Sequence, residues 1–205
     1  MSLPDTKGFT CPVVVTGNPV RRDVFAVGGQ KRGFDRRHLL IVGGSLGAHA
    51  LNKFMVEMLP VLKKALLEPV VKEAYARAGY DPSCVTAFIN DMPGAYSWAD
   101  LVLCRAGAST VAELCGAGVP SILVPYPYAA GDHQTGNARA LEQAGAAVLF
   151  QEKSLSASFL GGTITGLFGE PDRLAMMSRA ALGLARCDAA SRVADQIEAV
   201  AVKRQ

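Results

Sequence analysis

Residues 99–114 read ADLVLCRAGASTVAEL, and this stretch decides the fold class of the 205-residue chain. The apolar run Leu101–Cys104 predicts a buried parallel strand, because strands covered on both faces are continuously hydrophobic. The residues after it, Arg105–Ala108, are mostly small and predict a turn that lets a ligand approach the backbone. Ser109–Leu114 then predicts the start of a helix. A strand, a glycine turn and a helix in this order indicate an α/β protein.

The same alternation of apolar strands and helical patterns is present from His38 onward. It predicts a parallel sheet with helices on both faces. The expected strands are Leu39–Val42, Val85–Phe88, Leu101–Cys104, Ser121–Val124 and Ala147–Phe150. The expected helices are Ala48–Leu66, Met92–Trp98, Ser109–Ala117, Gln134–Ala144, Ser156–Leu167, Pro171–Arg186 and Ala189–Val202. Residues 28–33 (GGQKRG) are expected to form an exposed loop.

The composition is that of a globular chain, since half of the residues are hydrophobic and 21 are glycine. No apolar run reaches the roughly 18 residues that span a bilayer. The first ten residues do not resemble a signal peptide, so we expect the chain in the cytosol. The five cysteines form no Cys-x-x-Cys pair and mostly lie in apolar segments, which predicts reduced, buried thiols.

The net charge of +3 is mild, and it is compatible with a diphosphate ligand or an anionic membrane surface. Basic residues cluster near the N-terminus, at Arg21, Arg22, Lys31, Arg32, Arg36 and Arg37. No aromatic residues alternate with them as they would in a nucleic-acid groove. We therefore expect a solvated basic face and no nucleic-acid partner.

The helix expected after Gly107 is a candidate anion site. Its first turn, Ala108–Val111, presents backbone N–H groups and the positive end of the helix dipole, which together bind phosphate groups. Glu113 lies about one turn further in, where a carboxylate can accept hydrogen bonds from a ribose diol. A glutamate at this point is also common in helices without a ligand. Residues 131–137 (GDHQTGN) follow the next strand and supply polar groups for a sugar, so the arrangement suits a sugar nucleotide.

A second glycine turn, residues 43–48 (GGSLGA), follows the first expected strand and is another candidate anion site. Alone this turn is weak evidence for an anion site, because such turns also permit tight packing of a strand against a helix. It matches neither the Gly-x-Gly-x-x-Gly pattern nor a Walker loop, which disfavours a dinucleotide dehydrogenase and a P-loop enzyme. The histidines, His38, His49 and His133, lie far apart without carboxylates at ligand spacing. We therefore expect no metal and no cofactor.

Five motifs occur in the order found in one known family: TGNPVR (16–21), GGSLGA (43–48), FINDM (88–92), CRAGASTVAE (104–113) and AGDHQTGNA (130–138). On these motifs the chain resembles the MurG family. Its members are bacterial N-acetylglucosaminyltransferases that add a sugar to undecaprenyl-diphospho-muramoyl-pentapeptide. The similarity runs from about Val13 to the C-terminus.

The resemblance implies a GT-B glycosyltransferase, which is built from two Rossmann-like halves. Residues 13–205 would be the C-terminal half that binds the donor, and residues 1–12 a leader or linker remnant. The N-terminal acceptor domain, with its Gly-Gly-Thr-Gly-Gly-His loop, is absent from this sequence. The chain alone is therefore expected to bind the donor without transferring the sugar.

The implied activity is the inverting transfer of N-acetylglucosamine from UDP-N-acetylglucosamine to lipid I, which forms lipid II in peptidoglycan synthesis. The implied partners are UDP-N-acetylglucosamine and, through the missing half, the lipid-linked acceptor. The implied location is the inner face of the cytoplasmic membrane, as a peripheral protein.

The family's binding roles carry over to matching positions of this sequence. Arg21 and Ile89 would contact the uracil, and Gly44 with Ser45 would hold a phosphate. The diphosphate would lie at Ala108, Ser109, Thr110 and Val111, the ribose at Glu113, and the sugar at His133, Gln134 and Asn137. Ser45, Ser109 and Thr110 would also stabilise charge on the departing UDP, while the catalytic base is expected in the missing half.

Two other functions stay open at this point. The chain could be a non-catalytic module that binds a UDP-sugar or a protein, or another GT-B member such as a glycolipid synthase or an epimerase. The paired acids that an epimerase needs are not seen. Several residues also have purely structural interpretations: Arg105 as an ion-pair partner, Asp91 and Asp100 as helix-cap and turn residues, and Tyr96 and Trp98 as core residues.

The segment of residues 60–79 is shorter than in the family. A strand and a His-Gln-Ser/Thr-Gly loop are expected here, yet the helix that begins near Ala48 runs almost directly into Tyr75. Loss of a central strand would unpair the backbone groups of its neighbours. We therefore expect a loop to be missing from this sequence rather than the strand to be lost.

Overall fold

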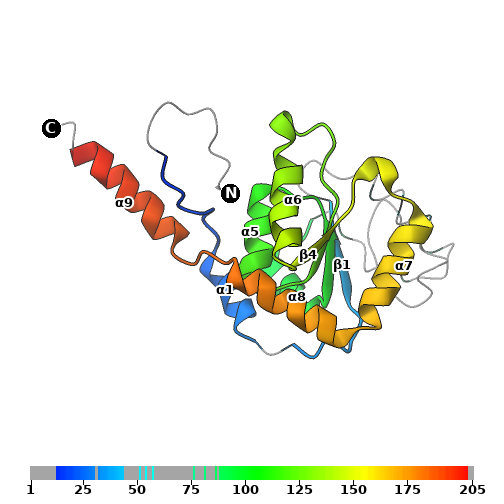
Figure 1. The fold of residues 1–205 in the computed structure, drawn as a ribbon. Helices are drawn as coiled ribbons and strands as arrows, with labels where there is room; N and C mark the ends of the chain where they lie inside the picture. The colour runs from blue at the N-terminus through cyan, green and yellow to red at the C-terminus, as the bar shows by residue number, and fades with distance from the viewer. Residues whose placement is uncertain are drawn as a thin grey trace.

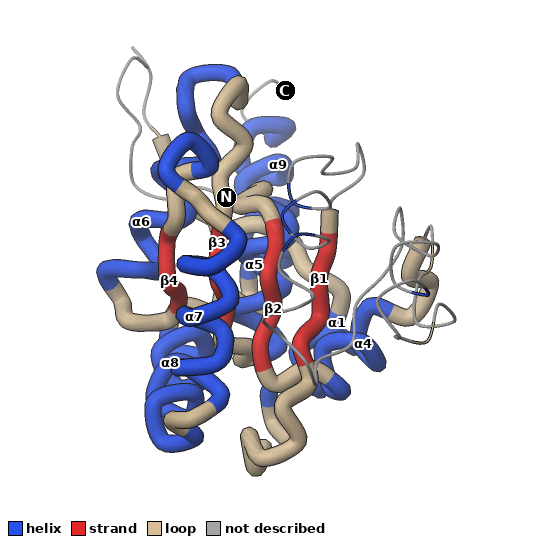
Figure 2. The backbone as a smooth tube through the Cα atoms, turned by 90° about the vertical axis from the view of Figure 1, so that its right-hand side faces the viewer, coloured by secondary structure: helices blue, strands red, loops and turns tan. Residues whose placement is uncertain are grey.

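The computed structural model describes residues 13–30, 32–43, 51, 54, 57, 76, 81, 86 and 88–202. The described part is built on a parallel four-stranded sheet with helices on both faces (Figures 1 and 2). The strands are β1 (Leu39–Val42), β2 (Leu101–Cys104), β3 (Ser121–Leu123) and β4 (Ala147–Leu149), in that spatial order. This confirms the α/β class and the parallel sheet expected from the sequence.

Seven α-helices accompany these strands in the described residues: α1 (Arg22–Gly28), α4 (Met92–Trp98), α5 (Ala108–Ala117), α6 (His133–Gln143), α7 (Ala157–Phe168), α8 (Pro171–Gly183) and α9 (Ala189–Val202). Two short 3-10 helices, η2 (Ala130–Asp132) and η3 (Glu152–Ser154), follow β3 and β4. The helices expected from Met92 onward are confirmed within a few residues. Of the helix expected over 48–66, Leu51, Phe54 and Glu57 are helical, and the rest lies outside the described residues.

The strand expected at 85–88 is not confirmed. Thr86 and Phe88 are described, and neither belongs to a strand. Phe88 is also 75% exposed, as a residue of a covered central strand would not be. The other two residues of that prediction lie outside the described part of the chain, as does most of the shortened segment 60–79.

Two apolar layers hold the sheet between the helices. On one face Leu101, Leu103 and Ile122 pack with residues of α7 and the first half of α8. On the other face Val102 and Cys104 pack with residues of α1, α4, α5 and α6. Figure 1 shows α5 and α6 on one side of the strands and α7 on the other. Burial on both faces explains why β2 reads as an unbroken apolar run.

The expectation of an exposed loop over residues 28–33 is wrong at its first residue. Gly28 is the last residue of α1 and is half-buried against α5. A Cβ at Gly28 would collide with the carbonyl oxygen of Gly116, so only glycine allows this approach of the two helices. Seven residues with a Gly-Gly end are a weak helical signal, and the tertiary contact decides the structure here.

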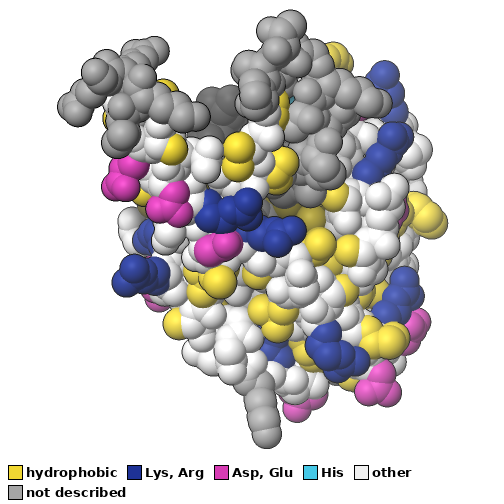
Figure 3. Space-filling view, turned by 60° about the vertical axis from the view of Figure 1, so that its left-hand side comes forward, with side chains coloured by type: hydrophobic (Ala, Val, Ile, Leu, Met, Phe, Trp, Pro, Cys, Tyr) yellow, Lys and Arg dark blue, Asp and Glu magenta, His cyan; other side chains and the backbone are white. Residues whose placement is uncertain are grey.

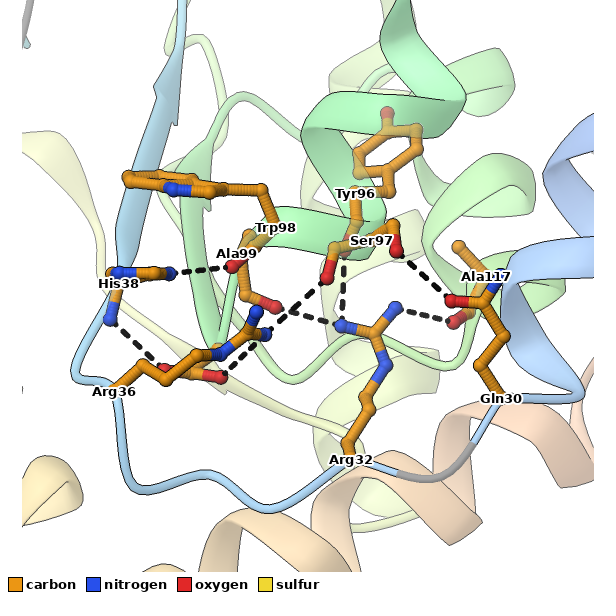
Figure 4. A network of polar contacts seen from close by, with 10 residues as sticks. Gln30, Arg32, Arg36, His38, Tyr96, Ser97, Trp98, Ala99 and Ala117 are labelled. Atoms are coloured by element: carbon orange, nitrogen blue, oxygen red, sulfur yellow. Dashed lines mark hydrogen bonds and ion pairs between the residues drawn. The ribbon is translucent and has the colours of Figure 1, made fainter.

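The expectation of a solvated basic face is wrong for Arg32, which is half-buried, whereas Arg36 is exposed as expected. The Arg32 guanidinium donates to the carbonyl oxygens of Tyr96 (2.9 Å), Ala99 (2.7 Å) and Ala117 (3.1 Å), as Figure 4 shows. These carbonyls lie in the last turns of α4 and α5, where helices leave acceptors unpaired. Burial lowers the pKa of Arg32.

Arg36 and His38 complete this polar network around a buried carboxylate. Asp100 is fully buried and accepts from the His38 backbone N–H (3.0 Å) and from Arg36 (3.3 Å). The His38 ring stacks on Trp98 with centroids 4.3 Å apart, and its Nδ1 donates to the Trp98 carbonyl (2.9 Å). Asp100 is thus a structural residue before β2, as expected. Asp91 is likewise confirmed as the cap of α4, because its carboxylate accepts from the Gly94 N–H (2.9 Å).

The described cysteines differ in burial. Cys104 and Cys115 are buried, and burial raises the pKa of each thiol to about 12. Cys187 is exposed, which corrects the expectation of buried thiols at that position. Cys11 and Cys84 lie outside the described residues.

Candidate functional site

Two of the segments predicted to bind a ligand, the turn before α5 and the start of α6, lie at the edge of the sheet where the strands end. In a parallel sheet these carboxyl ends lie on one side, and ligands of open α/β proteins bind outside them. The turn at residues 105–107 follows β2 and leads into α5. The loop at residues 124–129 follows β3 and leads through η2 into α6. The structure therefore brings the two predicted ligand segments to the same edge.

The N-terminus of α5 presents free backbone donors at this edge. Gly107 is its N-cap residue, and among the described residues no side chain caps the helix. Val111 N–H already donates to the Gly107 carbonyl (2.9 Å), so it is committed within the helix. The amides of Ala108, Ser109 and Thr110 are the ones that helix geometry leaves without an internal partner. The positive end of the helix dipole lies at the same place, which favours an anion.

Glu113 is half-buried, two residues beyond Val111, on α5. Its Oε2 accepts a hydrogen bond of 2.9 Å from the hydroxyl of Tyr96 on α4. Its Oε1 accepts no hydrogen bond from any described residue. Tyr96 is fully buried, as expected for a core residue. Burial and then the charge of Glu113 raise the pKa of Tyr96, so the phenol keeps its proton and acts as the donor.

The first turn of α6 holds the residues predicted for a sugar. Gln134 is half-buried, and its Oε1 accepts from the Tyr126 N–H (2.9 Å), which leaves the amide NH₂ to donate to a ligand. His133 is exposed, and its Nδ1 donates to the Ala130 carbonyl (2.7 Å), so Nε2 remains as the other ring nitrogen. Asn137 is different, because it is buried and its amide donates to the Ala106 carbonyl (2.9 Å). It ties α6 to the turn before α5.

Arg105 ties the ends of three strands together. Its guanidinium donates to the carbonyls of Val124 (3.1 Å) and Pro125 (3.2 Å) and forms an ion pair of 2.5 Å with Glu152. It also lies over the Tyr126 ring, 5.6 Å from the ring centroid. The structural interpretation of Arg105 as an ion-pair partner is confirmed. The edge around α5 and α6 is thus linked by side-chain contacts, and in the part of the chain that the structure describes Glu113 Oε1 and the Gln134 amide NH₂ have no partner.

This geometry agrees with what comparison of the sequence finds. The sequence profile described as "Glycosyltransferase family 28 C-terminal domain" matches residues 38–198. The chain belongs to glycosyltransferase family 28. The matched model is that of a C-terminal domain, as the resemblance implied.

Two similar curated relatives of this family 28 chain share one name: UDP-N-acetylglucosamine--N-acetylmuramyl-(pentapeptide) pyrophosphoryl-undecaprenol N-acetylglucosamine transferase. The protein of Nitratidesulfovibrio vulgaris strain DP4 is 45% identical over 210 residues, which cover 95% of this chain and 58% of the relative. That of strain DSM 19637 / Miyazaki F is 42% identical over 234 residues, covering all of this chain and 61% of the relative. This chain therefore spans about three fifths of the length of these relatives.

A solved structure gives the same result for the fold. MurG of Acinetobacter baumannii superposes with a TM-score of 0.70 at 36% identity, over 84% of this chain and 54% of that chain. The resemblance to the MurG family and the fold of one GT-B half are both confirmed. The Miyazaki F alignment is longer than this 205-residue chain, so the relative contains residues inside the aligned region that this chain lacks.

The structure shows fewer contacts for the other residues that were predicted to belong to the site. Arg21 is exposed before α1 and lies 3.5 Å from Asp23, and Ile89 is half-buried before α4. Gly44 and Ser45 lie outside the described residues. The TGNPVR motif does reach α5, because Asn18 donates to the Ser109 hydroxyl (3.4 Å).

Two residues of this edge, Tyr96 and Tyr126, were not predicted from the sequence to take part in the site. Tyr96 was expected only to pack in the core, and nothing in the sequence indicates that its hydroxyl meets a residue 17 positions further on. Tyr126 contributes a backbone N–H, for which side-chain patterns carry no signal.

Within the described residues no group of His, Cys, Asp and Glu side chains is arranged to hold a metal ion. None of the described helices has the length and apolar character to cross a membrane. On the face shown in Figure 3, the coloured basic side chains lie in small separate groups, several beside acidic ones. On that face they do not form the continuous stripe typical of nucleic-acid binding.

Proposed function

We propose that this chain binds UDP-N-acetylglucosamine and serves as the donor half of a MurG-type inverting transferase. The observation that carries the proposal is the uncapped start of α5 beside the half-free carboxylate of Glu113. Oriented N–H groups suit a diphosphate, and a carboxylate acceptor suits the adjacent ribose hydroxyls. The names of the relatives support the identity of the sugar and nucleotide.

The ligand would lie across the edge from α5 to α6. The diphosphate accepts from the amides of Ala108, Ser109 and Thr110, and the ribose donates to Glu113. The amide NH₂ of Gln134 donates to a sugar hydroxyl, with His133 beside it. In this proposal Ile89 and Arg21 flank the uracil, as the family resemblance suggests. Asn137 supports the turn through Ala106, and a direct contact of Asn137 with the sugar remains a prediction.

The chemistry that this half supplies is electrostatic. Cleavage of the glycosidic bond leaves negative charge on UDP, and the amides at the start of α5 are already oriented toward an anion. Ser109 and Thr110 add hydroxyls at the same turn, and Ser45 would add another. The helix dipole would then neutralise the leaving group without a metal ion. The base that activates the acceptor hydroxyl would come from the other half of the enzyme.

The acceptor and the location of the reaction follow from the same proposal. The acceptor would be lipid I, bound by an N-terminal domain such as the relatives' additional length allows. The chain would work at the inner face of the cytoplasmic membrane, where that lipid is exposed. This chain by itself would bind the donor and would not transfer the sugar.

Calorimetry tests the proposal directly. The 205-residue chain is titrated with UDP-N-acetylglucosamine, UDP-glucose and NAD. We expect binding that is tightest for the first ligand and absent for NAD. Absence of heat with UDP-N-acetylglucosamine would refute the proposal. The titration is repeated with Glu113→Ala, which removes the proposed ribose acceptor. Glu142→Ala is its matched control, because Glu142 is an exposed glutamate on α6 beyond the first turn of that helix.

A second candidate is a module that binds another protein domain through α9. The helix extends away from the sheet in Figure 1, and Ile197 and Val200 on it are 64% and 58% exposed. Mixing the chain with the N-terminal half of Acinetobacter baumannii MurG distinguishes the two functions. Restored transfer supports a donor half, whereas complex formation without transfer supports a binding module.

A further inference from the structure

The contact between Tyr96 and Glu113 joins a buried helix to the proposed ligand edge. Tyr96 is fully buried on α4, and its hydroxyl lies 2.9 Å from Glu113 Oε2 on α5. In Figure 4 its ring points away from the Arg32 network, which uses only the backbone carbonyl of Tyr96. The ring and the backbone carbonyl of Tyr96 thus take part in two separate polar contacts.

The direction of this hydrogen bond is fixed. A phenol can donate one proton, and an ionised carboxylate can only accept. The burial of Tyr96 and the nearby charge of Glu113 both oppose loss of the phenol proton. Among the described residues Glu113 is the only partner of the Tyr96 hydroxyl, and a buried hydroxyl without a partner is strongly disfavoured. The contact therefore holds Glu113 in one orientation.

That orientation leaves half of the carboxylate for a ligand. Oε2 is held by Tyr96, while Oε1 has no hydrogen-bond partner among the described residues. A free glutamate would lose rotamer freedom when it binds a hydroxyl, and a glutamate already held in place loses less. Fixing the acceptor in advance strengthens the hydrogen bonds that a ribose makes and leaves contacts to other parts of a ligand unchanged.

We propose that Tyr96 is a positioning residue that fixes Glu113 for the 2′- and 3′-hydroxyls of a nucleotide, and so sets the preference for ribose over deoxyribose. This inference rests on the proposed function, because it requires a nucleotide at the start of α5. Tyr96 touches no ligand itself. Its effect is expected only on ligands that carry the ribose hydroxyls.

The test compares UDP with 2′,3′-dideoxy-UDP on the wild-type chain and on Tyr96→Phe. Removing the hydroxyl should weaken UDP binding about tenfold and leave dideoxy-UDP binding nearly unchanged. Thr165→Val removes a hydroxyl from an exposed side chain on α7, which packs on the other face of the sheet, and it is the matched control that should change neither affinity. An equal loss for both ligands in Tyr96→Phe would mean a structural role only and would overturn the proposal.

A double-mutant cycle with Glu113→Ala adds an independent measurement. If Tyr96 acts through Glu113, the double variant should bind UDP no more weakly than Glu113→Ala alone. Additive losses would contradict the proposal. Should Tyr96→Phe fail to fold, Glu113→Asp serves instead, because it keeps the negative charge but its shorter side chain moves the carboxylate away from the Tyr96 hydroxyl. A wild-type ratio of UDP to dideoxy-UDP affinity in that variant would also contradict it.

The same experiment separates this inference from the proposed function. If the wild-type chain binds no uridine nucleotide, or binds UDP and dideoxy-UDP equally, the ribose role of Glu113 fails and the inference fails with it. The other outcome is that the wild type binds UDP more tightly than dideoxy-UDP, that Glu113→Ala removes this difference and that Tyr96→Phe keeps it. In that case only the role of Tyr96 is refuted.

Discussion

The two edges of the sheet use their polar groups in opposite ways. Where the strands begin, Arg32 donates to three backbone carbonyls and Asp100 accepts from two donors. Where they end, the start of α5 is uncapped and Glu113 uses one of its two oxygens. Arg32 and Asp100 at the first edge find their hydrogen-bond partners within the fold. Glu113 at the second edge is held by Tyr96, and its other oxygen has no partner among the described residues.

The largest expected effect is at the edge where the strands begin. Arg32→Ala should lower the free energy of unfolding by about 2–4 kcal/mol, because several hydrogen bonds from a charged donor are lost and carbonyls are left unpaired. Urea unfolding followed by circular dichroism measures it, with Arg179→Ala, an exposed change on α8, as the control. Donor affinity of the folded variant should match the wild type. A loss of donor affinity in the folded Arg32→Ala variant would contradict the proposal that the first edge serves stability and the second edge serves binding.

Glu113→Ala tests the opposite edge. We expect binding of UDP-N-acetylglucosamine to weaken by about 1–3 kcal/mol, because a charged acceptor is removed. Stability should also fall, since the buried Tyr96 hydroxyl loses its partner. Calorimetry and unfolding on the same preparation measure both quantities. Unchanged donor affinity together with lower stability would assign Glu113 to the fold alone.

Asn137→Ala should have an intermediate effect. It removes the hydrogen bond to the Ala106 carbonyl and should lower the free energy of unfolding by about 1–2 kcal/mol. Donor affinity should decrease less than in Glu113→Ala, because the turn before α5 is loosened but its amides remain. Gln143→Ala, an exposed change at the end of α6, is the control. A larger loss of affinity than in Glu113→Ala would indicate direct sugar contact.

The smallest expected effect concerns the core between the edges. Burial raises the pKa of Cys104 and Cys115 from an ordinary 9.0 to about 12. Protonated thiols therefore favour the folded state fully below pH 9, and this contribution is lost as the pH rises from 9 toward 12. Between pH 8 and 9 the loss should be less than about 1 kcal/mol. The double change of Cys104 and Cys115 to Ala should flatten this part of the pH profile, and an unaltered slope would contradict the assignment.

The sequence predicted four strands, the turn before α5 and the later helices because each has a local cause. Leu101–Cys104 is continuously apolar, and Gly107 precedes a helical pattern. It did not predict α1, because the contact of Gly28 with Gly116 is formed between helices far apart in the sequence. Local patterns suffice where neighbours along the chain determine the structure.

The roles of single polar residues were less predictable. Arg32 looked like part of a solvated basic run, yet its partners are backbone carbonyls 64 to 85 positions away. Such carbonyls exist at every helix end and leave no trace in residue identity. Asn137 and Gln134 were both expected at a sugar, although only Gln134 keeps its amide NH₂ free for a ligand. Which polar atom remains unpaired is a property of three-dimensional structure.

Arg105 has a consequence for how such a site can diversify. One guanidinium links the ends of β2 and β3 to Glu152 after β4, so a shift of one of the three connecting loops would disturb contacts to the others. A new sugar preference in related proteins would then arise by exchanging side chains on an unchanged scaffold, not by remodelling a loop. Swapping Gln134 and His133 between relatives should transfer selectivity, whereas grafting a whole loop should not unless Arg105 and Glu152 are transferred with it.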